Sequence, residues 1–305
     1  MTARTGLGVL EVAALSAVAE VGAVAGASRR ATSEVLEVLE RESGIAARYA
    51  YPLLQDLAAP WRLHLPLLDG AGSWGSQRGD RPGDAHHTEV RLTEVGALAL
   101  AAEREQVGPV PLGLIEGSLY RDGPVPPFDP ARVVRALQSG GQDAGGPVLP
   151  TGGTVEGDLE ALLSGGRTRL RLACSLEREP SALCISAVPL GVRVDDVEHA
   201  LSSAASGLRP RRYADYLAAE PEETAPPSFG VVDVQDESSG RDGVRVLCTL
   251  TPGSDVDAAE RWARAVWPVT VEVDCRLPAP MTDRLRQWDA GDGSGLDALA
   301  RLLPG

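Results

Sequence analysis

Hydrophobic residues recur every three or four positions near the beginning of the chain. Leu10, Leu15 and Val18 share one face at helical spacing, and the same period returns twice before residue 60. The third repeat contains Pro52, which has no backbone donor and clashes with the preceding turn, so we expect that helix to begin late or to kink. The pattern predicts three helices, over 10–21, 34–42 and 46–58.

Residues that favour helix ends flank the second of these helices. Thr32 or Ser33 can cap its first turn, and Gly44 can end it, because glycine readily takes the left-handed conformation. Glu37 and Arg41 are one turn apart, which predicts an ion pair on the exposed face.

A strand, a glycine-rich loop and a long helix are predicted next. Residues 61–68 are hydrophobic enough for a strand, and the glycine-rich stretch 69–80 follows directly. Asp84 can cap a helix that extends to about Glu105. A short helix over 131–138 closes this half of the chain.

The second half alternates between strand and helix patterns. Strands are predicted over 168–175, 182–189, 230–234, 243–250 and 269–275, and helices over 155–163, 194–206, 255–266 and 296–303. The acidic, proline-containing stretch 220–228 is predicted to be a mobile loop. This order is typical of the α+β class.

Charge narrows the range of partners. The chain has 305 residues, enough for two domains, and a formal net charge of −14, with arginine as its only strongly basic residue type. A negative charge of this size excludes a broad basic groove for nucleic acid. Between Ser28 and Arg91, however, arginines and acids nearly balance, which leaves room for local contact with DNA.

The cysteines and the hydrophobic N-terminal stretch bear on location. No two cysteines form a C-x-x-C pair, and each lies in an apolar context, so we expect buried free thiols at Cys174, Cys184, Cys248 and Cys275. Glu11 and Glu20 interrupt the hydrophobic stretch 7–27, which argues against a membrane helix or a signal peptide. We expect a cytoplasmic protein.

One segment carries a family resemblance. It reads DGAGSWGSQRGD over 69–80 and continues as DAHHTEVRL over 84–92. This resembles the pattern DGxGNFGSxDGD followed by AxRYTExRL in the A subunits of DNA gyrase and topoisomerase IV. Further ordered similarities lie at 51–61, 126–129, 150–153, 165–168, 187–190 and 236–245.

The resemblance implies a fold and an extent. It implies a winged-helix DNA-gate domain over 1–138 and a tower-like α+β domain over 139–305. We expect a truncated relative, because the family's coiled coil, C-terminal gate and DNA-wrapping propeller have no counterpart in this sequence. The family's segment that wedges between base steps also lacks a match; only 112–124 fills that interval.

The resemblance also locates a site that has lost its reactive residue. His87 stands where the family has the tyrosine that attacks DNA, and His86 stands where it has an arginine that neutralises the phosphate. A tyrosine forms a phosphodiester that can be religated, whereas an imidazole would give a labile phosphoramidate. The predicted helix start at Asp84 would also disfavour positive charge on both histidines. We therefore predict no catalytic residue, and we expect Tyr49, Tyr51 and Tyr120 to pack the domain.

Two other roles concern residues around this site. Adjacent helical residues point about 100° apart, so His86 and His87 are poorly placed to bind one metal ion, and no metal site is predicted. Phosphate contacts are the expected role of five arginines, each of which could equally be solvated or ion-paired: Arg29, Arg30, Arg48, Arg78 and Arg91. The cluster 209–212 is another basic turn of this kind.

The resemblance bears on cofactors and partners as well. In the family, Mg²⁺ and ATP belong to a separate B subunit, and we expect no cofactor in this chain. Duplex DNA, a gyrase B-like subunit, full-length gyrase A and a second copy of the chain are the candidate partners. Three functions follow: a DNA-binding or topoisomerase-partner module that does not cleave DNA, an active divergent type II topoisomerase working with a separate B subunit, and an interaction protein that modulates a true gyrase without binding DNA.

Overall fold

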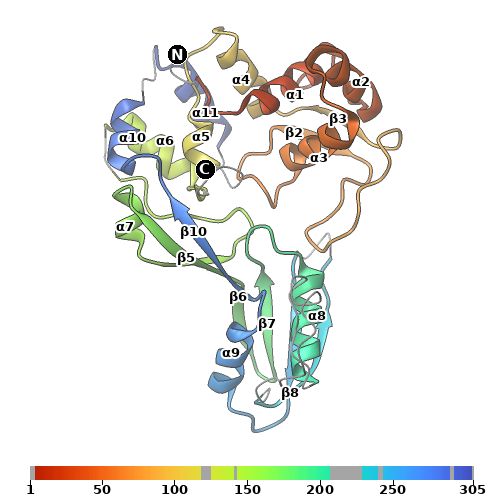
Figure 1. Cartoon of the computed structure of the whole chain (residues 1–305), viewed down its shortest axis with the longest axis vertical. Helices are drawn as coiled ribbons and strands as arrows, with labels where there is room; N and C mark the ends of the chain where they lie inside the picture. The colour runs from red at the N-terminus through yellow and green to blue at the C-terminus, as the bar shows by residue number, and fades with distance from the viewer. Residues whose placement is uncertain are drawn as a thin grey trace.

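The chain folds into two lobes of mixed α and β structure. The computed structural model describes residues 4–117, 125–140, 143–206, 229–239, 243–288 and 292–303. A large lobe contains both termini of the described chain, and a smaller lobe extends from it (Figure 1). All three sheets are antiparallel, and the longest described helices have 12 residues, so the described part contains no long coiled coil.

The first part of the large lobe is a group of helices around a small sheet. Its elements are α1 (Val9–Glu20), β1 (Arg30–Ala31), α2 (Thr32–Ser43), α3 (Ala47–Ala58), β2 (Leu68–Ala71), β3 (Glu89–Leu92) and α4 (Glu94–Glu103). Strand β3 lies between β1 and β2. Val90 and Leu92 of β3 point into the core and alternate with the more exposed Glu89 and Arg91, which is the pattern of a half-buried strand.

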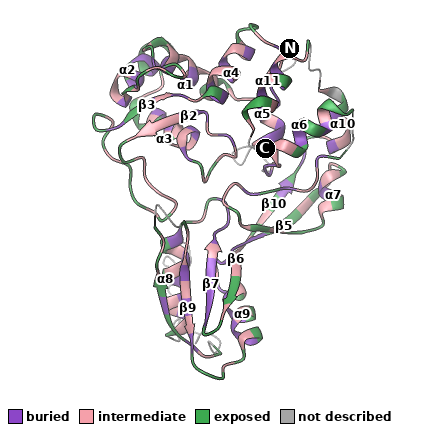
Figure 2. Ribbon diagram, turned by 180° about the vertical axis from the view of Figure 1, so that it is seen from behind, coloured by how far each residue is buried: buried purple, intermediate pink, exposed green. Residues whose placement is uncertain are grey.

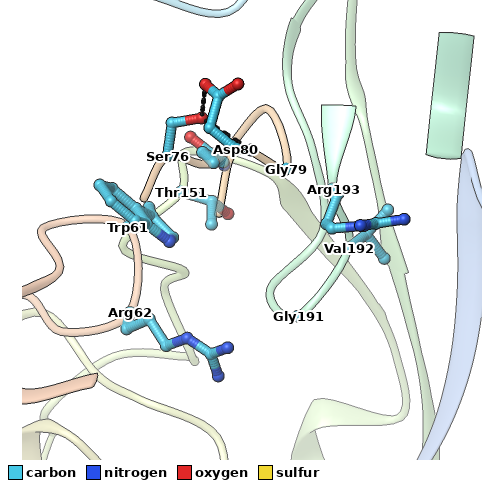
Figure 3. Close-up of a pocket in the computed structure, with 10 residues that line it drawn as sticks. Trp61, Arg62, Ser76, Gly79, Asp80, Thr151, Gly191, Val192 and Arg193 are labelled. Atoms are coloured by element: carbon cyan, nitrogen blue, oxygen red, sulfur yellow. Dashed lines mark hydrogen bonds between the residues drawn. The ribbon is translucent and has the colours of Figure 1, made fainter. Parts of the chain in front are cut away.

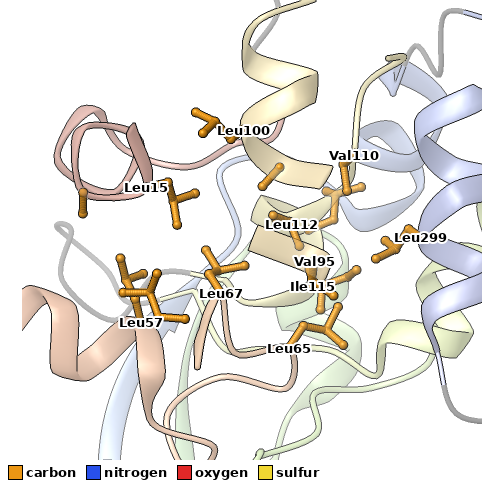
Figure 4. Packing of buried hydrophobic residues seen from close by; sticks show 14 of the residues in the cluster. Leu15, Leu57, Leu65, Leu67, Val95, Leu100, Val110, Leu112, Ile115 and Leu299 are labelled. Atoms are coloured by element: carbon orange, nitrogen blue, oxygen red, sulfur yellow. The ribbon is translucent and has the colours of Figure 1, made fainter. Parts of the chain in front are cut away.

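A second sheet completes the large lobe. Its strands lie in the order β10-β5-β4, with β4 (Thr154–Gly157), β5 (Arg167–Ala173) and β10 (Thr270–Arg276). Around it lie α5 (Leu112–Ile115), α6 (Pro130–Gln138), α7 (Leu159–Leu163), α10 (Met281–Gln287) and α11 (Ser294–Leu302). One hydrophobic core joins both sheets, and Leu299 from the end of the chain packs into it near Val110 and Leu112 (Figure 4).

The small lobe has its own core. Its four-stranded sheet has the order β6-β7-β9-β8, with β6 (Ser175–Glu179), β7 (Ala182–Ala187), β8 (Val231–Asp236) and β9 (Val246–Leu250). Helices α8 (Val194–Ala205) and α9 (Val256–Ala265) contribute Val197, Leu201 and Trp262 to this core. The buried and exposed positions of the two lobes are compared in Figure 2.

Most of the predicted elements are confirmed. Helices α1, α2, α3, α6, α8, α9 and α11 and strands β5, β7, β8, β9 and β10 lie where the hydrophobic pattern placed them, within a few residues. Gly44 ends α2 in the left-handed conformation, with φ of 66°. All four cysteines are free and buried. The stretch 220–228 lies outside the described residues, as do 209–212.

Other local predictions are wrong. The long helix from Asp84 is instead a turn, the strand β3 and then α4, which is capped by Thr93 accepting from Gly96 N–H. Residues 61–67 are irregular, and the strand begins only at Leu68. Helix α3 begins at Ala47, well before Pro52.

Further differences concern α2 and the second half of the chain. Neither Thr32 nor Ser33 caps α2 through its side chain. Arg41 pairs with Glu20 and Glu42 rather than with Glu37. Strand β4 occupies the start of the predicted helix over 155–163, which leaves only α7. The pattern also missed β6, α5 and α10. No helix in the described ranges is long and apolar enough to cross a membrane.

Candidate functional site

The loop that joins β2 to β3, residues 72–88, is folded back on itself and is called the histidine loop below. Gly83 N–H donates to the Ser73 carbonyl at 2.8 Å, which brings its two limbs together. Gly72 has a φ of +88°, and a Cβ at this position would lie 2.6 Å from the His87 carbonyl oxygen. Glycine is therefore required where the limbs meet.

Tyr51 of α3 supports the base of this loop. Its hydroxyl donates to the Gly83 carbonyl at 2.6 Å and lies 3.2 Å from Thr88 Oγ1. Its ring meets Trp74 edge-on, with 6.0 Å between the ring centroids. Because the hydroxyl proton is committed to a carbonyl, the role of Tyr51 here is structural, in agreement with its predicted packing role. Tyr49 differs from its prediction, since it is 64% exposed, and Tyr120 lies outside the described residues.

His86 and His87 are exposed in the turn that precedes β3. The carboxylate of Asp84 accepts from His86 N–H at 2.9 Å, and its carbonyl accepts from His87 N–H at 2.8 Å. Asp84 thus stabilises a turn and does not cap a helix. The predicted spread of the two imidazoles by helical geometry does not apply, because neither residue is helical.

The N-terminus of α2 packs against the same turn. Thr32 N–H donates to the Thr88 carbonyl at 2.9 Å, and Ser33 N–H donates to the Ala85 carbonyl at 3.1 Å. Helix α2 has no side-chain cap, so carbonyls of the histidine loop satisfy these amides instead. The positive end of the α2 dipole therefore lies beside the exposed histidines.

Asp69, the first residue of the glycine-rich motif, accepts two guanidinium groups. Arg29 Nη2 and Arg91 Nε each lie 2.8 Å from its Oδ2 atom, and Arg91 also donates to the Ala27 carbonyl at 2.8 Å. Partial burial acts to raise the pKa of Asp69, but the hydrogen bonds and charges of the two arginines outweigh it and lower that pKa. Both arginines are thus engaged within the protein.

Arg30 and Arg48 differ in how far they are engaged. Arg30 pairs with Glu34 at 2.6 Å in an exposed i,i+4 contact. Arg48 stacks its guanidinium 4.8 Å from the centroid of the Tyr49 ring. Within the described ranges, Arg48 has no carboxylate partner, which distinguishes it from the other four predicted phosphate contacts.

Arg78 extends from the histidine loop to the small lobe. Its Nε atom lies 2.8 Å from Asp236 Oδ2 and 3.5 Å from Asp195 Oδ1. A pocket of about 140 Å³ lies along this seam, lined by Trp61, Arg62, Ser76, Gln77, Gly79, Asp80, Thr151, Gly191, Val192 and Arg193. Ser76 and Asp80 from the loop form one side of it, and Val192 and Arg193 from the small lobe form another (Figure 3).

The structure brings together only part of the predicted site. His86, His87 and the α2 N-terminus share one region, while Arg29 and Arg91 meet at Asp69 and Arg78 contacts the small lobe. Sequence reasoning missed the role of Asp69, although its place at the head of the glycine motif was a usable signal. Among the described residues, no three His, Cys, Asp or Glu side chains are grouped so that they could hold a metal ion.

Comparison with known proteins supports the resemblance. No model of a known protein family matches the chain. It is 28% identical to the DNA gyrase A subunit of Brachyspira hyodysenteriae over 265 residues, which is 74% of this chain and 30% of that protein. It is 25% identical to the corresponding protein of Mycobacterium bovis over 66% of this chain and 27% of that protein.

A shorter similarity extends to a second enzyme. The DNA topoisomerase 4 protein of Neisseria gonorrhoeae that corresponds to gyrase A is 33% identical over 88 residues, or 28% of this chain and 12% of that protein. The chain spans about 30% or less of the length of these curated relatives. The relatives agree with the ordered motifs and with the mixed α+β fold. The chain is a divergent gyrase A-like protein.

Proposed function

We propose that this chain binds duplex DNA without breaking it. The observation that carries the proposal is His87, which stands exposed at the position of the family's attacking tyrosine. An imidazole–phosphate bond is labile, so it would not support the controlled breakage and religation that an aryl phosphodiester allows. Tyr51, the tyrosine beneath the loop, donates its hydroxyl proton to a carbonyl and does not replace the missing phenol.

The element order supports a winged-helix arrangement for the DNA-facing part. The order α1, β1, α2, α3, β2, β3, with β3 between β1 and β2, is the one expected for that motif. In this proposal residues 1–138 form the winged-helix domain, α3 and the histidine loop face DNA, and residues 139–305 form the tower-like domain. Strands β5 and β10 pack against the core of the large lobe, which would fix the two domains relative to each other.

Arg48 is the arginine that we propose as the principal phosphate contact. It is exposed at the start of α3, and its cation is stacked on an aromatic ring rather than neutralised by a carboxylate. Arg30 is a second contact, since an exposed pair with Glu34 contributes little stability and can be exchanged for a phosphate. For Arg29, Arg78 and Arg91 the phosphate role stays a prediction, in competition with their internal pairs.

The test is a fluorescence anisotropy titration of a labelled duplex over a salt series. Binding through phosphates predicts a linear loss of log affinity with log salt, and Arg48→Ala should make the slope shallower by about 0.9. Arg104→Ala, which removes an exposed arginine at the end of α4, is the matched control and should leave the slope unchanged. Equal slopes for all three proteins would contradict the role of Arg48.

The net charge of −14 favours a second candidate function, an interaction protein that binds a topoisomerase subunit rather than DNA. This candidate predicts no DNA binding even at low salt, together with complex formation with gyrase B or with full-length gyrase A. In both candidates the chain itself carries no cofactor, and Mg²⁺ and ATP would act only through a separate B subunit. Size-exclusion chromatography with each purified gyrase protein distinguishes the two candidates.

A further inference from the structure

The histidine loop satisfies the first amides of two helices that belong to different lobes. Its Ala85 and Thr88 carbonyls accept from α2, and its Gln77 and Arg78 carbonyls accept from α8. The distances at α8 are 3.1 Å from Val194 N to Gln77 O and 3.0 Å from Asp195 N to Arg78 O. Neither helix has a side-chain cap. One loop therefore supplies at both helices the acceptors that helix ends require.

The Arg78 side chain adds an ion pair to the contact with α8. The carboxylate of Asp236 is only 8% exposed, and its Oδ1 atom accepts from Ser238 N–H at 2.8 Å. Its Oδ2 atom lies 2.8 Å from Arg78 Nε, although no aligned hydrogen bond reaches it. A carboxylate this buried is destabilising unless a cation faces it. Arg78 supplies that cation from the other lobe.

The residue after Arg78 permits this close approach. Gly79 has a φ of +125°, and a Cβ there would lie 2.9 Å from Asp195 Oδ2 and 3.3 Å from Arg193 Cδ. A larger residue would therefore push the loop away from the start of α8. The Arg78-Gly79 pair thus provides both the charge and the space that the contact needs.

We propose that Arg78 is a positioning residue, which fixes the exposed His86–His87 turn relative to the small lobe by holding the histidine loop on α8. The turn is then held from two sides, by α2 in the large lobe and by α8 in the small lobe. A displacement of one lobe would move the turn. This inference goes beyond the proposed function, because it concerns contacts within the chain and is tested without DNA.

The test uses Arg78→Gln, with Arg78→Lys as the conservative variant and Arg81→Gln as the matched control. Arg81 is an exposed arginine of the same loop, and within the described ranges it has no ion pair. Hydrogen exchange of the Val194 and Asp195 amides should be about tenfold faster in Arg78→Gln than in the wild type. Arg78→Lys should restore most of the protection, and Arg81→Gln should leave it unchanged.

The four histidines provide a spectroscopic readout of position, since each imidazole gives separate NMR signals. Arg78→Gln should shift the signals of His86, His87 and His199, which lies on α8, but not the signal of His64 in the large lobe. Arg78→Lys should return them towards the wild-type positions. Unchanged His86 and His87 signals together with unchanged Val194 and Asp195 exchange would overturn the proposal, as would equal effects of Arg81→Gln.

The wild-type protein offers a test that does not depend on a variant folding. If the loop and the start of α8 open together, Gly79, Gly83, Val194 and Asp195 should exchange at similar rates under native conditions. Protection factors for the loop and α8 amides that agree within about tenfold support the proposal. A larger separation between the two sets would overturn it, because α8 would then open independently of the loop.

Discussion

Arg29 and Arg91 reach one carboxylate, Asp69, from two different segments of the chain. The three side chains are each about one third exposed, so the interaction is only partly screened by solvent. It fixes the start of the glycine motif on the segment before β1. At the residue scale, this contact makes Asp69 a determinant of the local fold rather than a ligand for DNA.

We predict that Asp69→Asn lowers the free energy of unfolding by about 1–3 kcal/mol at pH 7, because two adjacent guanidinium groups lose their shared counter-ion. The folded-state pKa of Asp69 lies below its ordinary value of 3.8, so this stabilisation is present above that pH and is lost as the pH falls below it. Urea unfolding at pH 7 and at pH 3 measures both effects. An equal difference at the two pH values would contradict this role.

Glu116 predicts the opposite pH dependence. Burial raises the pKa of its carboxyl to about 7, although it accepts from the His64 and Leu65 amides at 2.9 Å each, which acts to lower it. The folded state therefore binds this proton more tightly than the unfolded state. Stability should fall as the pH rises from the ordinary value of 4.5 to about 7, by up to about 3 kcal/mol.

Glu116→Gln should remove this dependence. Burial lowers the pKa of neighbouring His64, an effect of opposite sign that is common to both proteins and cancels in the comparison. Unfolding of wild type and variant between pH 4.5 and pH 8 checks the prediction. Parallel stability profiles across that range would show that Glu116 does not titrate there.

At the scale of elements, the histidine loop depends on glycines that sequence alone marks but does not explain. Gly72 and Gly26 both have positive φ, +88° and +78°, yet only at Gly72 would a Cβ meet backbone, the His87 carbonyl oxygen at 2.6 Å. Gly26 has open space around it. The two positions therefore separate backbone strain from the closure of the loop.

We predict that Gly72→Ala destabilises the protein by about 2 kcal/mol more than Gly26→Ala, because it adds a steric clash to the same conformational strain. Thermal or urea unfolding of the two variants measures this difference, and tryptophan fluorescence reports whether Trp74 moves. Equal destabilisation would mean that the loop adjusts without cost and that its limbs are not held together as described.

Local patterns predicted the elements whose signal is local. Helix α2 follows from its 3.6-residue period and from Gly44. The helix expected from Asp84 failed because the strand alternation of 89–92 was read as part of the following helix, whose real cap is Thr93. Contacts such as Arg78 with Asp236 join residues far apart in sequence and distinct in motif, so no local spacing could have indicated them.

At the scale of the whole molecule, the two lobes meet where the histidine loop lies. The chain is acidic overall, yet Arg30, Arg48 and the α2 N-terminus place positive charge near an exposed turn whose reactive tyrosine is replaced by His87. This combination supports contact with DNA and offers no residue suited to reversible cleavage. Restoring the phenol alone by His87→Tyr should not create cleavage, because His86 still replaces the arginine that neutralises the phosphate.

The most direct measurement is the gel mobility of an end-labelled duplex incubated with the protein, Mg²⁺ and gyrase B, run with and without SDS. DNA binding without cleavage predicts a shifted band in the native gel that disappears completely in SDS. A shifted band that survives SDS would show a covalent protein–DNA bond and contradict the loss of cleavage. No native shift at low salt would contradict DNA binding.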